Sequence, residues 1–296
     1  DPLGVSVSSL PCGTRLIDCG VKAAGGFEAG RRLAQICLSG LGDVFIAARR
    51  VAAGLQEVSV ATKEPVAACM ASQYAGWEVK RDKFFAMGSG PMRAAACREE
   101  IFKDIGNCEQ PEVCVGVLET RKVPPDDVCQ DLAEKCRIMP DKLTLLVAPT
   151  SSIAGTVQIV ARSVETALHK LHVLGFDLSR VVSGFGKAPL PPVAGDDLAA
   201  IGRTNDAILY GGHVMLSVRG DDDSLREIGP RVPSNSSPDY GRPFGEIFAR
   251  YNNDFYRIDP MLFSPGSVTF VNVDTGQRHE FGRLAPDVLA ESFTKK

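Results

Sequence analysis

Apolar and polar positions alternate in blocks along this chain, and the blocks predict strands and helices in turn. Short apolar runs predict buried strands at residues 17–21, 58–62, 66–71, 83–87, 113–119 and 143–149. Runs with helical spacing predict helices at residues 31–40, 91–96, 126–137 and 153–171. Strands that alternate with helices favour an α/β fold.

The pattern is weaker in the C-terminal third. Residues 184–195 and 229–243 are rich in Gly and Pro, which makes the pattern looser there, whereas residues 208–218 read as a strand. Residues 268–274 close with Thr275-Gly276, which predicts a hairpin turn. A length of 296 residues favours two domains. We place the approximate boundary between residues 147 and 148, giving an N-terminal α/β lobe at 1–147 and a C-terminal α/β lobe at 148–296, and the two lobes can interleave along the chain.

Composition and charge narrow the classes of function. The net charge is -3 and no basic stripe occurs, which argues against nucleic-acid binding. No apolar run approaches the roughly 20 residues that span a bilayer, so no membrane segment is expected. The nine cysteines are odd in number and lack Cys-x-x-Cys spacing, which argues against a disulfide framework and a zinc knot. We expect most of them to be small buried thiols in a reducing cytosol.

The predicted helix at residues 153–171 carries the most informative polar pattern. Gln158, Arg162, Glu165 and His169 are spaced three or four residues apart, so they form one polar stripe. A solvated helix face with an Arg–Glu pair would look the same. The functional interpretation is that the stripe lines a cleft, where a carboxylate beside an arginine can take a proton from water and return it.

A glycine-rich loop is the second candidate. Gly88, Ser89 and Gly90 precede a predicted helix, whose first backbone N–H groups can bind a phosphate, a carboxylate or the polar edge of a ring. Lys83 lies just before this loop, and a tight turn is the structural alternative. The histidines and acidic residues show no zinc-ligand spacing, so no metal site is predicted.

Two polar connectors could line a pocket or be ordinary loops. Residues 202–206, which include Asn205 and Asp206, precede a predicted strand. Residues 255–260, which include Tyr256 and Asp259, mix aromatic and charged side chains.

The chain resembles the methenyltetrahydromethanopterin cyclohydrolases. The matching stretches lie in the family's order at residues 17–21, 71–77, 85–91, 148–152, 158–165, 202–206 and 255–265. Each stretch alone is weakly specific, but together they span nearly the whole chain. Met92 departs from the pattern, because a small residue is usual there.

The resemblance implies two α/β lobes with a deep pocket between them and a cytoplasmic homotrimer. It implies an enzyme of one-carbon metabolism that hydrolyses 5,10-methenyltetrahydromethanopterin to the 5-formyl derivative, without metal or redox cofactor and with water as co-substrate. The family's catalytic residues fall on Arg162 and Glu165. We expect substrate contacts from Lys83, Ser89, Gly90, Gln158, Asn205, Asp206, Tyr256 and Asp259.

Two other functions stay open at this stage. A pterin-dependent one-carbon transferase could use the same pocket, but it would need a nucleotide or second carrier site, and no P-loop is present. A non-catalytic pterin-binding protein could keep the fold, although the retained Arg162 and Glu165 argue against decay of the site.

Overall fold

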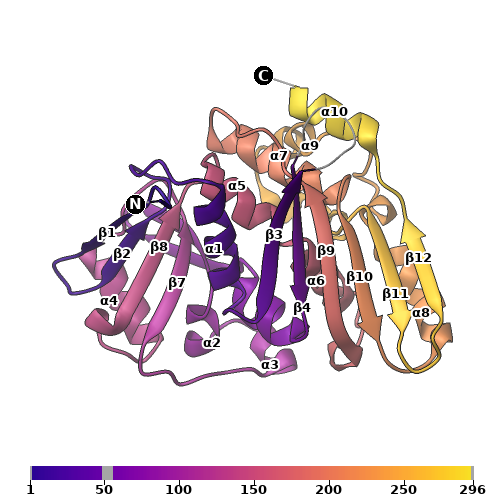
Figure 1. The fold of residues 1–296 in the computed structure, drawn as a ribbon, viewed down its shortest axis with the longest axis horizontal. Coiled ribbons are helices and arrows are strands. Elements are labelled where there is room, and N and C mark those ends of the chain that lie inside the picture. Colours follow the sequence, from indigo (N-terminus) through magenta and orange to yellow (C-terminus); the bar gives the residue numbers. More distant parts are fainter. Residues whose placement is uncertain (1, 49–55, 295–296) are drawn as a thin grey trace. The chain divides into compact units, whose positions relative to one another are not determined.

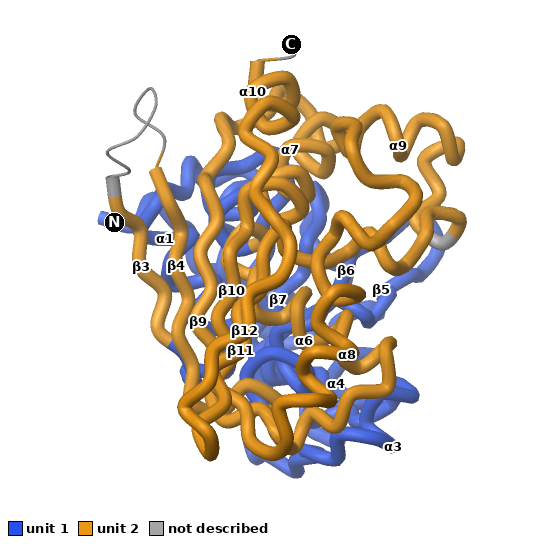
Figure 2. The backbone as a smooth tube through the Cα atoms, turned by 90° about the vertical axis from the view of Figure 1, so that its right-hand side faces the viewer, with its two compact units in different colours: residues 1–42, 67–158 blue, residues 43–66, 159–296 orange. Residues whose placement is uncertain are grey.

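The computed structural model describes residues 2–48 and 56–294, and these form a mixed α/β protein. The chain divides into two compact units, each built on one six-stranded sheet in the described residues (Figure 1, Figure 2). Unit 1 comprises residues 1–42 and 67–158, and unit 2 comprises residues 43–66 and 159–296. The predicted α/β class is confirmed, while the domain boundary between residues 147 and 148 stays a prediction.

The sheet of unit 1 has the order β1-β2-β8-β7-β6-β5. The strand bounds are β1 Ser6–Ser9, β2 Arg15–Asp18, β5 Trp77–Arg81, β6 Phe84–Ser89, β7 Cys114–Glu119 and β8 Leu143–Ala148. Strands β2, β8 and β7 are parallel, whereas β1, β6 and β5 pair antiparallel with their neighbours. The carboxyl ends of the three parallel strands therefore lie at one edge of the sheet.

Helices pack on both faces of this sheet. Their bounds are α1 Phe27–Cys37, α2 Met92–Ala96, α3 Ile101–Ile105, α4 Asp126–Lys135 and α5 Ile153–Val160. Successive side chains of a strand point to opposite faces. Val117 of β7 accordingly packs with α1 and α5, whereas Leu118 packs with α2 and α4.

The sheet of unit 2 has the order β12-β11-β10-β9-β4-β3. The strand bounds are β3 Gly42–Ala48, β4 Gln56–Thr62, β9 Val181–Pro189, β10 His213–Val218, β11 Ser267–Asn272 and β12 Arg278–Gly282. Strands β10 and β11 are parallel, whereas β4 with β9, β9 with β10 and β11 with β12 are antiparallel. The hairpin predicted at Thr275-Gly276 is confirmed, since it joins β11 to β12.

The helices of unit 2 are α6 Ser163–Val173, α7 Asp197–Leu209, α8 Asp222–Ile228, α9 Phe244–Arg250 and α10 Pro286–Thr294. A core of aromatic and aliphatic side chains joins α7 and α9 to the turns that follow; it contains Leu209, Tyr210, Phe244, Ile247, Phe248, Ile258 and Leu262. In the described residues, no helix is both long enough and apolar enough to cross a membrane.

Three predicted elements differ from the structure. Residues 66–71 form part of the π-helix η1 (Val66–Gln73) instead of a strand, because a short apolar run does not distinguish a buried strand from a buried helix. The helix predicted at residues 153–171 is broken at residues 161–162 into α5 and α6. Residues 202–206 lie inside α7 instead of forming a connector.

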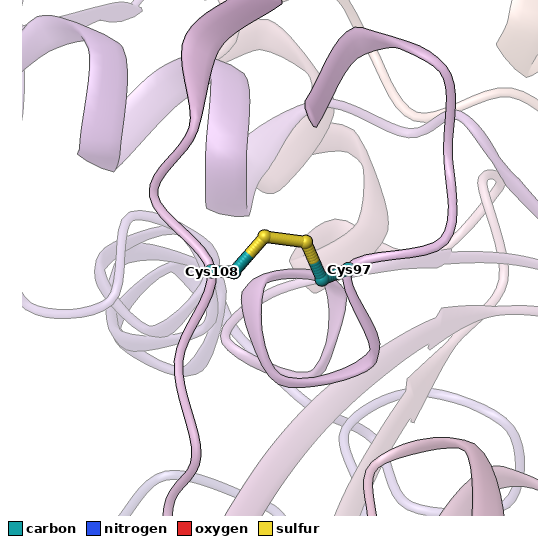
Figure 3. The surroundings of a disulfide bond; sticks show 2 residues. All are labelled: Cys97 and Cys108. Atoms are coloured by element: carbon teal, nitrogen blue, oxygen red, sulfur yellow. A yellow bond between two sulfur atoms is a disulfide. The ribbon is translucent and has the colours of Figure 1, made fainter. Parts of the chain in front are cut away.

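One pair of cysteines does not remain as thiols. Cys97 and Cys108 form a disulfide in unit 1 (Figure 3). Cys97 lies at the carboxyl end of α2, and the chain returns to it through α3. An odd cysteine count says nothing about one pair that a returning loop brings together. The expectation that most cysteines are small buried thiols is confirmed, because seven of the nine are free thiols and six of these are buried.

Candidate active site

The first turn of helix α6 holds the two residues that the sequence singles out most strongly. Helix α5 ends at Val160, and the backbone N–H of Arg162 donates to the carbonyl of Ile159 across the break. Arg162 is the N-cap residue of α6, and Glu165 is the third residue of that helix. The two residues therefore lie together on one helical turn of unit 2.

Both side chains are buried. Arg162 is 6% exposed and Glu165 is 4% exposed, so the interpretation of this stripe as a solvated helix face is wrong. A buried charge is costly unless its surroundings compensate for it. The amino end of a helix stabilises a negative charge through its free N–H groups and its dipole, and Glu165 occupies this position.

Two glycines of β9 fix where this turn lies. A Cβ atom added to Gly186 would lie 2.4 Å from Oγ of Ser163, and one added to Gly184 would lie 2.6 Å from Cγ1 of Val164. Any larger residue would therefore push the amino end of α6 off the sheet. The close approach positions Glu165 through its two neighbours in the helix.

Farther along α6, His169 is not suited to acid–base chemistry near neutral pH. Burial, together with a smaller contribution from the nearby His172, lowers the pKa of His169 to about 4. The imidazole is therefore neutral at pH 7, so His169 adds no positive charge to the polar stripe on which the sequence placed it.

Lys170 is a buried cation that the sequence analysis did not select. Its ammonium donates to Oγ of Ser236 at 3.1 Å and to the carbonyl of Met261. Burial lowers its pKa to about 8, although the charge of Asp259 opposes this shift. Nearby, Asp259 accepts from Oγ of Ser237 at 2.6 Å and from the backbone N–H of Met261 at 3.1 Å. Lys170 thus ties α6 to residues 234–262.

Asn205 and Asp206 make contacts around helix α7. Asn205 donates from Nδ2 to the carbonyl of Ile201 at 2.9 Å, within the helix. Oδ1 of Asp206 accepts from the backbone N–H of Phe244 at 2.7 Å. Burial raises the pKa of Asp206 to about 7. These contacts show Asp206 linking α7 to α9, and the predicted substrate contacts of Asn205 and Asp206 stay predictions.

Unit 1 brings two other predicted residues together around one thiol. Sγ of Cys37 lies 3.7 Å from Oγ of Ser89 and donates to Oε1 of Gln158 at 3.8 Å. Ser72 completes the group, because its Oγ donates to the carbonyl of Cys37 at 2.7 Å and its own carbonyl accepts from Gly90 at 2.9 Å. Gly90 has φ +89°, which explains the glycine at this turn. The group gathers segments far apart in sequence into one buried polar cluster.

The remaining predicted residues lie in different surroundings. Lys83 is exposed next to β6, and its carbonyl accepts from the ammonium of Lys122 at 2.8 Å. Tyr256 lies in the turn η6 (Phe255–Arg257), and its side chain is outside the described part of the structure. In the described residues, no group of three or more His, Cys, Asp or Glu side chains is arranged to hold a metal ion.

A cavity of about 430 Å³ lies elsewhere in unit 1, between α2 and α4. It is lined by Ala96, Arg98, Asp131, Glu134, Lys135 and Arg137. Lys135 pairs with Asp131 at 2.5 Å across one helical turn, and none of the predicted site residues lines it. We place no chemistry there, because its charged groups are ordinary surface partners.

Comparison with known proteins identifies the family. The cyclohydrolase (MCH) family model matches residues 1–293. The chain belongs to this cyclohydrolase family. It is 49% identical over 294 residues to methenyltetrahydromethanopterin cyclohydrolase of Xanthobacter autotrophicus, covering 99% of this chain and 87% of that protein. The identity to the protein of the same name from Methylobacillus flagellatus is 48% over 292 residues, covering 98% and 89%. For that of Methanosarcina barkeri it is 41% over 298 residues, covering 99% and 92%.

This cyclohydrolase contains polar groups that the sequence analysis missed. Glu119 ends β7, and Thr150 follows β8 and donates from Oγ1 to Oε1 of Glu119. The rule that ligands bind at the carboxyl ends of parallel strands could have selected both residues. Lys170 gave no such signal, because a lysine in an amphipathic helix is normally solvated.

Proposed function

We propose that this protein hydrolyses 5,10-methenyltetrahydromethanopterin to 5-formyltetrahydromethanopterin, with Glu165 as the general acid and base. The observation that carries the proposal is the family match over nearly the whole chain, together with the burial of Glu165 in the first turn of α6. Relatives at 48% and 49% identity bear the name of this activity.

The chemistry needs one water and one group that moves a proton. The substrate carries a positive charge delocalised over N5, the methenyl carbon and N10, so this carbon is already electrophilic. Water adds to the carbon and gives a proton to Glu165, which forms a neutral carbinolamine. Glu165 then protonates N10, the C–N10 bond breaks with its electrons going to nitrogen, and the hydroxyl proton is lost to solvent as the formyl group forms. The net release is one proton.

Arg162 supports this role from the neighbouring N-cap position. A guanidinium keeps its charge throughout the pH range in which enzymes work. Its positive charge favours the ionised carboxylate that accepts the proton from water. We propose that Arg162 tunes Glu165 and holds its side chain in place, without exchanging protons itself.

The reaction requires neither a metal nor a redox cofactor, because no carbonyl must be polarised and no electron is transferred. We propose that water is the only co-substrate. Addition of a chelator should therefore leave the hydrolysis rate unchanged.

Absorbance-followed hydrolysis of 5,10-methenyltetrahydromethanopterin tests the proposal. We expect turnover by the wild type, with or without chelator, and a kcat lower by about 10²–10⁴-fold in Glu165→Gln with little change in KM. Glu227→Gln is the matched control, because Glu227 is an exposed glutamate on α8 of the same unit. Binding of the substrate without turnover by the wild type would instead identify a pterin-binding protein.

We also propose that the protein assembles as a homotrimer, as the resemblance implies. Phe45 of β3 is 56% exposed, and Phe185 of β9 pairs with Met215 of β10 in a partly exposed position. Exposed apolar side chains that gather in one patch are typical of surfaces that bind another chain, and we propose that Phe45 and Phe185 belong to such a patch. Light scattering should give three times the chain mass, and Phe45→Asp should lower it; a monomeric wild type would overturn the proposal.

A further inference from the structure

Among the described residues, the buried hydrophobic cluster on the α1 side of the unit 1 sheet does not extend to β6 or β5. The hydrophobic cluster on the α1 side takes its buried members from α1, β7, β8, α5 and the residue after β2. On β6, Phe84 and Ala86 belong to the cluster on the opposite side. Phe85 and Met87 alternate with them and so point to the α1 side, where Phe85 is 51% exposed and Met87 is partly exposed.

The strand register places a carboxylate beside these two apolar side chains. Met87 of β6 lies directly opposite Glu119 of β7 and opposite Glu78 of β5. Directly opposite residues of an antiparallel pair share a face and have neighbouring side chains. Glu119 is partly exposed, and its carboxylate therefore borders the apolar surface made by Met87 and Phe85.

This carboxylate also lies at a position where α/β sheets bind ligands. Helix α4 follows β7 and packs on one face, whereas α5 follows the adjacent parallel strand β8 and packs on the other. Adjacent parallel strands whose connections leave on opposite faces form a crevice at their carboxyl ends. Glu119 is the last residue of β7 at this crevice, and the hydroxyl of Thr150 after β8 donates to Oε1 of Glu119.

We propose that Phe85, Met87 and Glu119 form a platform that binds the pterin ring of the substrate. This inference rests on the proposed function and names the part of unit 1 that recognises the substrate. The pterin is a planar ring system whose pyrimidinone edge carries adjacent N–H donors. An ionised carboxylate only accepts hydrogen bonds and takes two parallel donors well, while the apolar side chains contact the face of the ring.

Charge favours the ring over the anionic tail of the substrate as the occupant. The reacting ring system carries a net positive charge, which Glu119 attracts. A phosphate or carboxylate at the same place would meet a like charge. Arg121 lies at the same strand end, and its guanidinium donates to Oγ of Ser151 at 2.5 Å.

Steady-state hydrolysis by two variants tests the platform. We expect Glu119→Gln to raise KM by about 10- to 100-fold with kcat nearly unchanged, because the lost hydrogen bonds to the pyrimidinone edge, away from the reacting carbon, act equally in substrate and transition state. Phe85→Ala should raise KM by about 3- to 10-fold through lost ring contact. The controls are Glu112→Gln and Val113→Ala, which change exposed residues before β7. Thermal unfolding of each variant should match the wild type within a few degrees.

A second substrate separates ring recognition from tail recognition. The methenyl derivative of tetrahydrofolate has the same ring system and a different tail, and it can be measured as a competitive inhibitor. We expect Glu119→Gln to weaken it by the same factor as the methanopterin substrate. A penalty confined to the methanopterin substrate would assign Glu119 to the tail and overturn the proposal, as would wild-type KM values in both variants.

The outcomes also separate this inference from the proposed function. If the wild type hydrolyses the substrate and Glu165→Gln does not, the proposed function stands whatever the two platform variants show. If the wild type neither hydrolyses nor binds the substrate, the proposed function and the platform both fail.

Discussion

Helix α6 carries two buried charges that the protein uses in different ways. Glu165 is in the first turn and Lys170 lies five residues later, roughly 140° around the helix. Glu165 is 4% exposed and Lys170 is fully buried, so burial does not distinguish them. The difference lies in their surroundings, since Lys170 donates to a hydroxyl and a carbonyl that anchor it to residues 234–262.

The comparison shows what a buried charge is for. The acceptors around Lys170 hold it in one place and connect two segments, which is a structural role. Glu165 lies at a helix amino end that stabilises negative charge, beside an arginine, and next to glycines that bring the helix close to β9. Burial alone therefore shows only that the protein needs the charge. The local contacts show whether the role of the charge is structural or catalytic.

The largest expected effect comes from replacing each charge by a neutral side chain. One replacement should lower kcat and leave stability unchanged, and the other should lower stability and leave kcat nearly unchanged. Glu165→Gln should lower kcat by about 10²–10⁴-fold while leaving the free energy of unfolding nearly unchanged. Lys170→Met should lower the free energy of unfolding by about 1–3 kcal/mol, because it leaves buried acceptors without their donor, and should keep kcat within a few-fold. Enzyme assays and urea unfolding measure the two effects.

Lys63→Met is the control for Lys170→Met, since Lys63 is an exposed lysine of the same unit. A large loss of kcat in the folded Lys170→Met variant would remove the contrast and place Lys170 in the chemistry.

The glycines under α6 sharpen the comparison at its catalytic end. In Gly186→Ala the new Cβ would lie 2.4 Å from Oγ of Ser163, so the first turn of α6 must move. We expect a loss of about 1–3 kcal/mol in stability and about 10- to 100-fold in kcat, because Glu165 moves with the turn. Gly195→Ala is the control, since that glycine has open space around it. Ser163→Ala in the Gly186→Ala background should restore part of the activity by removing Oγ.

The two regions also differ in how far the sequence predicts them. The strands at residues 58–62, 113–119 and 143–149 follow from apolar runs, and the structure confirms them within two residues at each end. The break at residues 161–162 could not be predicted, because no glycine or proline marks it. The helix pattern continues through the break, so tertiary packing and not local propensity ends α5.

Only the part of the candidate site that lies within one short segment of the chain could be predicted from the sequence. Arg162 and Glu165 are neighbours in sequence, and the resemblance selected them directly. Ser89 and Gln158 meet at Cys37, a contact between three distant segments that periodicity does not encode. Lys170 was missed for a related reason, since its partners Ser236 and Met261 follow loops whose path the pattern leaves open.

The smallest expected effect is the pH dependence of the free energy of unfolding, which reports on the charge of Lys170. Burial lowers the pKa of Lys170 from 10.5 to about 8, with Asp259 opposing the shift and Arg231 adding to it. Between these two pH values the unfolded chain keeps a proton that the folded protein releases, so unfolding becomes less favourable as pH rises. The free energy of unfolding of the wild type, relative to Lys170→Met, should therefore increase by on the order of 1–3 kcal/mol from pH 8 to pH 10.5. Urea unfolding of both proteins at several pH values measures this difference, and subtraction removes the other titrating groups. If the difference in free energy of unfolding between wild type and Lys170→Met does not change over this range, the pKa of Lys170 is the same in the folded and unfolded protein. The contacts with Ser236 and Met261 would then offset the whole cost of burying its charge.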